Sequence, residues 1–313
     1  MEKKPIFIHL ESFTWKSEEE YIIKKSIRNL HSPFMDLADD ARRRLKRVGK
    51  KCIPYIIEAI EQNDLDSDIV RYELPEVLAL FKKDAVSFLI PCLDNPNEDL
   101  VYVAKSAIEE VGKNAVPILC KEIETDNLVI KQKIIEILGS IGDKKAIPVL
   151  VKCLSDPDES IRDEAEWSLT EIGSSCYDQV LPLLSSDSVQ LLCSAIYILP
   201  QVDQAKGVSA VIPLFNHPDD DVYNSVIDSL MGLNPAPVDE LLSHIHSEST
   251  QELIGILNVL ANSRNILVIE KISHLKEHPD DDVKEIAEWA IDLLTRSQNE
   301  KPIPIYPDNR VED

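Results

Sequence analysis

The chain has 313 residues, of which 44% are hydrophobic and 5% aromatic, and only eight are glycine. Strands need β-branched or aromatic runs and many turns, so this composition favours helices. The net charge of −23 disfavours nucleic-acid binding, which depends on Lys and Arg displacing counterions from phosphates. The same charge favours basic protein partners.

The cysteines and the N-terminal sequence indicate the cellular compartment. The six cysteines form no C-x-x-C pair, and most lie in apolar runs such as FLIPCL. We therefore expect free, buried thiols in a reducing cytoplasm. The sequence MEKKPIFIHLESF lacks the long apolar region of a signal peptide, and no run of 18 apolar residues follows. We expect a cytoplasmic protein without a membrane span.

Residues 1–33 are predicted to form an N-terminal capping segment. Ser17 is a candidate N-cap, and the acids that follow it suit the first turn of a helix over 17–31. A basic cluster comes next, at 42–51, so residues 1–51 carry a net charge of +5 and the remainder −28. Nucleic acid or an anionic membrane could bind this cluster, but contact with acidic groups of the chain or a partner is favoured by the acidic remainder.

One apolar stripe recurs along the rest of the chain. In residues 156–173 it consists of Ile161, Ala165, Leu169 and Ile172, which share one face of an α-helix. Nine copies begin 30 to 33 residues apart, and only the copy starting at Glu252 breaks the pattern at its ends. Such regularity indicates structural repeats.

A second helix is predicted between successive stripes. It often has Pro in its first turn, as at Pro117 and Pro148, where the missing N–H is not needed. Acidic turns such as DPDES precede the striped helix and cap its N–H groups. Glycines follow four stripes and suit a left-handed position that ends a helix: Gly49, Gly112, Gly142 and Gly173. Neither helix can bury its apolar face alone, so neighbouring repeats must stack.

The sequence AIPVLVKCLSDPDESIRDEAEWSLTEIG, at 146–173, and its copies resemble the HEAT-like repeat family, in the short bacterial form named after the phycobilisome lyases. The resemblance covers residues 34–296 and implies an all-α, right-handed α-solenoid of about nine two-helix repeats. We expect these residues to form one domain. The tail at 297–313 contains several prolines and no helical period, so we expect it to be extended or disordered.

In such folds, the side of the striped helix opposite the stripe usually lines the concave groove. Positions two before and two after the second stripe residue point to that side. Aromatic anchors among carboxylates suit a peptide or helix bearing Lys or Arg. Packing of these aromatic residues between helices is the alternative interpretation. The candidate binding residues are Tyr72, Tyr102, Glu136, Asp163, Trp167, Tyr197, Asp228 and Trp289.

We expect no metal, no cofactor and no catalytic site. Deoxyhypusine hydroxylases place His-Glu pairs on such helices to hold iron, and no histidine occupies the corresponding positions here. His217 and His278 precede prolines in acidic turns, where we expect exposed turn residues. The HPDDD turns lack the ligand spacing of an EF-hand, and no phosphate-binding loop or nucleophile motif is present.

The sequence therefore predicts a protein-binding scaffold that acts as a monomer on a basic protein or peptide. Two alternatives remain. The resemblance implies a bilin lyase-like or other enzyme-accessory role, although no bilin-specific residue is identified. The acidic charge also suits an immunity or inhibitor protein that masks a basic toxin.

Overall fold

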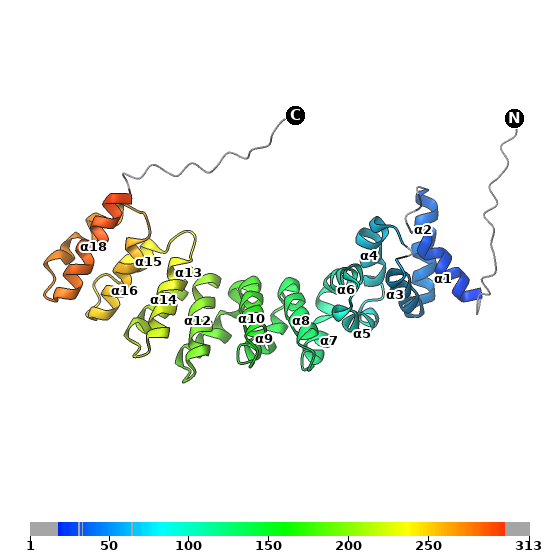
Figure 1. The fold of residues 1–313 in the computed structure, drawn as a ribbon, viewed down its shortest axis with the longest axis horizontal. Coiled ribbons are helices and arrows are strands. Elements are labelled where there is room, and N and C mark those ends of the chain that lie inside the picture. The colour runs from blue at the N-terminus through cyan, green and yellow to red at the C-terminus, as the bar shows by residue number, and fades with distance from the viewer. Residues whose placement is uncertain (1–17, 31, 33, 64, 298–313) are drawn as a thin grey trace, which may run out of the picture. The chain divides into compact units, whose positions relative to one another are not determined.

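The computed structural model describes residues 18–30, 32, 34–63 and 65–297, and these residues form helices and short turns without any strand. Pairs of antiparallel helices follow one another along the chain (Figure 1). No helix in this part of the chain is long and apolar enough to cross a membrane. Residues 1–17 of the predicted cap, with Ser17, and residues 298–313 of the predicted tail lie outside the described residues.

The second helix of each pair, called the B helix here, contains the predicted stripe. These helices confirm the nine predicted copies and the all-α solenoid class. They are α2 (Met35–Val48), α4 (Leu74–Ala79), α6 (Glu98–Val111), α8 (Leu128–Ile141), α10 (Glu159–Ile172), α12 (Val189–Val202), α14 (Asp220–Met231), α16 (Thr250–Ala261) and α18 (Asp281–Ser297).

The first helix of each pair, the A helix, is shorter, and a 3₁₀ turn extends several of them. The helix predicted within the cap occupies the A position of the first pair, because it contacts α2. The A helices are α1 (Glu18–Arg28), α3 (Ile53–Glu61), α5 (Lys83–Leu89), α7 (Val116–Glu122), α9 (Ile147–Cys153), α11 (Tyr177–Val180), α13 (Gln204–Val211), α15 (Val238–Ser243) and α17 (Leu267–Ile272).

The second stripe departs from a regular α-helix. Residues Ile69–Glu73 form a π-helical turn before α4, and the N–H of Leu74 donates to the carbonyl of Ile69. Pro75 explains the irregularity, because proline has no N–H and its ring clashes with the carbonyl four residues earlier. The wider turn accommodates the ring while Val70 and Leu74 remain buried.

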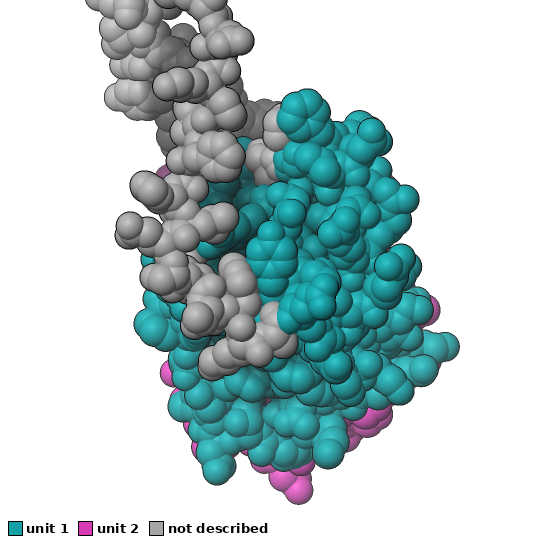
Figure 2. Space-filling view, turned by 90° about the vertical axis from the view of Figure 1, so that its right-hand side faces the viewer, with its two compact units in different colours: residues 1–145 teal, residues 146–313 magenta. Residues whose placement is uncertain are grey.

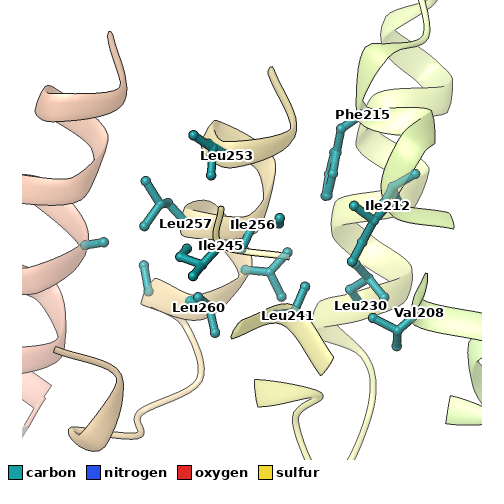
Figure 3. Packing of buried hydrophobic residues seen from close by; sticks show 14 of the residues in the cluster. Val208, Ile212, Phe215, Leu230, Leu241, Ile245, Leu253, Ile256, Leu257 and Leu260 are labelled. Atoms are coloured by element: carbon teal, nitrogen blue, oxygen red, sulfur yellow. The ribbon is translucent and has the colours of Figure 1, made fainter. Parts of the chain in front are cut away.

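Contacts divide the chain into two compact units, residues 1–145 and 146–313 (Figure 2). In the second unit, side chains from α13, α15 and α16 converge in one buried cluster (Figure 3). Phe215 is fully buried there, and a Cβ on Gly255 would lie 2.6 Å from its Cε1 and Cγ atoms. Gly255 therefore leaves the space that the Phe215 ring occupies.

The stripe is the buried side of the B helices. Its second and third residues are buried in every copy except at Ile291, which is half-buried. Burial of this kind contributes about 1.5–3 kcal/mol per large aliphatic side chain. The sequence period therefore fixes which side of each B helix remains for other contacts.

The turns that end and begin the B helices follow two rules. All four predicted glycines have positive φ, and Gly142 has the left-handed α conformation. The other three, Gly49, Gly112 and Gly173, combine positive φ with ψ between −138° and −156°. Only glycine adopts that second conformation readily. At the other end of the helix, a side chain two residues before the N-cap accepts a hydrogen bond from the N-cap N–H. The acceptors are Ser32, Asn95, Thr125, Asp156, Ser186, His217, Ser247 and His278.

His217 and His278 are therefore half-buried acceptors rather than exposed turn residues. The Nδ1 atom of each ring lies 3.2 Å from the N–H nitrogen it binds, at Asp219 and Asp280. The expectation of exposed histidines was wrong, because the ring nitrogen satisfies a backbone donor that the turn would otherwise leave open.

Candidate functional site

We define the B-helix face as the positions two before and two after the second stripe residue of each B helix. The five predicted aromatic residues on it are exposed, with 68% of Tyr72, 48% of Tyr102, 58% of Trp167, 37% of Tyr197 and 44% of Trp289 accessible. None of the five is buried between helices. Large aromatic surfaces left open on a soluble protein are candidates for binding contacts.

Two of the three acidic groups on this face in unit 1, Asp39 and Glu136, are paired with the unit's own cations, whereas Glu76 is exposed. Glu136 on α8 accepts hydrogen bonds from Lys105 Nζ at 2.5 Å and Lys133 Nζ at 2.8 Å. Burial opposes its ionisation, but the two lysines outweigh burial and lower its pKa. Lys105 also pairs with Glu109 at 3.8 Å. The predicted Glu136 is therefore half-buried and its charge is already balanced.

The B-helix face of unit 2 has a different charge balance. Helices α12, α14 and α16 contain no Lys or Arg. Asp163 on α10 and Asp228 on α14 are exposed, and neither forms an ion pair within the described residues. Arg162 instead donates to the carbonyls of Asp156 and Pro157, and Arg296 pairs with Asp292. Uncompensated negative charge therefore lies beside Trp167 and Tyr197.

Polar side chains behind this surface join successive B helices of unit 2. Ser194 Oγ donates to Glu166 Oε1 at 2.6 Å, joining α12 to α10. Ser225 Oγ donates to Cys193 Sγ at 3.1 Å, joining α14 to α12. Burial raises the pKa of Glu166, although the Ser194 hydrogen bond lowers it, and Asp163 adds to the rise. These links were not predicted from the sequence. Glu166, Ser194 and Ser225 lie one position from the second stripe residue of their helices, and Cys193 lies two positions before it.

The basic cluster at 42–51 is partly paired within unit 1. Arg42 contacts Glu73 and Asp39, Arg44 pairs with Asp40 at 2.6 Å, and Lys51 pairs with Glu19 at 3.1 Å. These contacts agree with the predicted pairing to acids. Exposed pairs of this kind add about 0–1 kcal/mol each, so they mainly balance charge.

The thiols of three cysteines are unsuited to nucleophilic chemistry. Burial raises the pKa of Cys52 to about 12 and those of Cys92 and Cys176 to about 11. A thiol with so high a pKa stays protonated at neutral pH, and the thiolate is the reactive form. Among the described residues, no group of three or more His, Cys, Asp or Glu side chains is arranged to hold a metal ion.

Comparisons with known proteins confirm the type of repeat. The family model described as HEAT repeats matches residues 116–186. A stretch of 158 residues of this chain is 27% identical to the uncharacterized phycocyanin operon protein Y of Pseudanabaena tenuis. That match covers 46% of this chain, and the chain spans 38% of the length of the relative. The protein is an α-solenoid built from HEAT-like repeats.

The chain is also similar to two solved structures. The complex of CpcE and CpcF of phycocyanin lyase from Nostoc is 19% identical, with 68% of this chain and 92% of that chain covered and a TM-score of 0.33. The karyopherin Kap121p, bound to the extreme C-terminus of the protein phosphatase Cdc14p, is 12% identical, with 93% and 39% covered and a TM-score of 0.44.

Proposed function

We propose that this protein is a monomeric scaffold that holds a basic protein on its B-helix face and performs no catalytic step. One observation carries the proposal: aromatic side chains at equivalent positions of separate repeats are exposed, while the stripe opposite them is buried. Repeats present such side chains in a row, so many modest contacts add up along an extended surface.

The charge balance favours unit 2 for the main contacts of this proposal. Trp167, Tyr197 and Trp289 are the proposed anchors, and Asp163 and Asp228 supply negative charge that the unit does not neutralise. Tyr72 and Tyr102 offer additional apolar contacts in unit 1. Glu136 contributes little to a basic partner in this proposal, because Lys105 and Lys133 already hold it.

Affinity capture from lysate of the source cells, at low and high salt, tests the proposal. We expect wild type to capture a basic protein that salt releases and that Trp167→Ala/Trp289→Ala does not capture. Both side chains are exposed, so the double variant should fold normally. The control is Ile266→Ala/Leu267→Ala, which removes apolar side chains exposed beside and on the A helix α17. Equal capture by both double variants would place the binding site elsewhere.

The similarity to a phycocyanin operon protein favours a second candidate function. In this case the chain would assist bilin attachment or removal on light-harvesting subunits. Mixing the protein with free bilin and recording the visible absorption spectrum tests the idea. A shifted or sharpened band would support it, whereas an unchanged spectrum would leave the scaffold proposal as the better one.

A further inference from the structure

Five side chains at equivalent positions form a row on unit 2. Each lies two residues after the second stripe residue of its helix and therefore about 160° around the helix from it. Consecutive B helices of the unit, from α10 to α18, contact one another, so the row is continuous. We call it the central row, and its members are Trp167, Tyr197, Asp228, Asn258 and Trp289.

The spacing of the central row selects a partner conformation. Helices packed side by side lie about 8–10 Å apart, which sets the distance between neighbours in the row. A polyproline II segment has about three residues per turn and rises about 3.1 Å per residue. Its side chains therefore return to the same face every third residue, after about 9 Å. The two periods match without distortion of either chain.

An α-helical partner could also follow the row, with one contact every seventh residue, but it would leave nearby amides unused. Asn224 is exposed, and its side chain forms no hydrogen bond within the described residues. Asn258 Nδ2 donates to Tyr223 Oη at 3.4 Å, which leaves the side-chain oxygen, Asn258 Oδ1, open. An α-helix satisfies its backbone groups internally, whereas an extended segment presents them to such amides.

The charges determine which side chains the segment must carry. Asp228 stands in the middle of the row on a helix without Lys or Arg, and its neighbours α12 and α16 also have none. A cation at the middle contact position would therefore meet an unpaired carboxylate. Trp167, Tyr197 and Trp289 are exposed, and aromatic rings also attract Lys or Arg.

We infer that the bound part of the partner is an extended segment of about thirteen residues whose contact side chains recur every third position, with Lys or Arg opposite Asp228. This inference rests on the proposed function and specifies its ligand. A basic helix could follow the row, but it would leave the amides of Asn224 and Asn258 without a partner backbone to bind.

Three labelled synthetic peptides test the inference by fluorescence anisotropy with the full chain. The first has thirteen residues, with Arg at positions 1, 4, 7, 10 and 13 and Pro or Ser between them. The second has the same composition with all five Arg residues at one end. The third is an alanine-rich helix with Arg at every seventh position. We expect the first peptide to bind about tenfold more tightly than the second. Only the first peptide spaces its cations about 9 Å apart, so that each one lies opposite a residue of the central row.

Variants of the row locate the peptide. Trp167→Ala and Trp289→Ala should each lower the affinity for the first peptide by up to about fivefold. Asp228→Asn should lower the same affinity by up to about fivefold. The effect of Asp228→Asn should disappear for a peptide whose central Arg is replaced by Gln, because the pair is then already broken. Leu267→Ala, on α17, should leave every affinity unchanged.

Equal binding of the first two peptides, tighter binding of the helical peptide, or an Asp228→Asn effect that survives the Arg-to-Gln change would overturn the inference. Failure of all three peptides would also overturn it. In each case, capture of a basic protein that depends on Trp167 and Trp289 would leave the proposed function standing. Loss of that capture as well would remove both.

Discussion

A hydrogen bond between neighbouring repeats compensates for a proline inside α12. Pro200 has no N–H, so the carbonyl of Ile196, four residues earlier, lacks its usual helical donor. Ser229 on α14 replaces that donor, because its buried Oγ lies 2.7 Å from the Ile196 oxygen. We predict that Ser229→Ala destabilises unit 2 and that Pro200→Ala rescues most of the loss.

The size of the effect follows from the burial of the carbonyl. An orphaned buried acceptor costs about 1–3 kcal/mol. In a Pro200→Ala background, the N–H of residue 200 can donate to Ile196, so Ser229→Ala should cost about 1–2 kcal/mol less there. Removing the proline ring also changes the free energy of unfolding directly. That change is the same with Ser229 or Ala at position 229, so it cancels from the coupling energy.

Urea unfolding followed by circular dichroism measures the four free energies of the cycle. Repeat stacks can unfold in parts, so hydrogen exchange at the amides of α12 and α14 should accompany it. Ser243→Ala is the control, because its hydroxyl donates to an exposed carbonyl, that of Glu240, within one helix and should matter by less than about 0.5 kcal/mol. A coupling energy near zero between positions 200 and 229 would refute the compensation.

Two further predictions concern unit 2. Gly255→Ala places a Cβ against the buried ring of Phe215 and should lower the free energy of unfolding by about 1–3 kcal/mol, with Phe215→Leu as a partial rescue in the same urea assay. For Glu166, burial raises the pKa in the folded state above the ordinary value of 4.5, so the folded protein binds this proton more tightly than the unfolded chain. The stability that the protonated Glu166 gives the folded state is therefore fully present below pH 4.5. It is lost as the pH rises through the pKa of Glu166 in the folded protein. Glu166→Gln should remove this loss from a series of urea titrations across pH, and an unchanged pH profile would show that Glu166 is not the group responsible.

The fold could be predicted from the sequence because the spacing of the stripe matches the turns of an α-helix. Residues such as Ala165 and Leu169 recur at helical spacing, and the structure buries them at the same place in each repeat. The π-helical turn at Ile69–Glu73 was not predicted, although Pro75 was a visible signal for an irregular helix. Val70 and Leu74 are four residues apart and both buried, a spacing that fits an α turn and a π turn alike, so the stripe did not reveal the irregularity.

Charge pairing on the candidate face could not be predicted in the same way. Glu136 and Asp228 occupy the same register position, yet only Glu136 is held by lysines. One of these, Lys105, lies 31 residues away in sequence and reaches Glu136 from the preceding B helix. Whether a long side chain reaches across depends on helix spacing and rotamer, which the sequence pattern does not specify. The exposure of the aromatic residues, by contrast, follows directly from their place opposite the stripe.

The N-cap turns show that one structural task can be performed by chemically different side chains. The N–H of the N-cap residue is bound by different chemical groups in different repeats. The acceptor is an amide at Asn95, a carboxylate at Asp156, a hydroxyl at Ser186 and an imidazole at His217. Any of these groups preserves the helix start, so this edge of each repeat tolerates a neutral, acidic or titratable residue. Evolution or a designer can therefore change the charge along this edge repeat by repeat while the stacked helices keep their register.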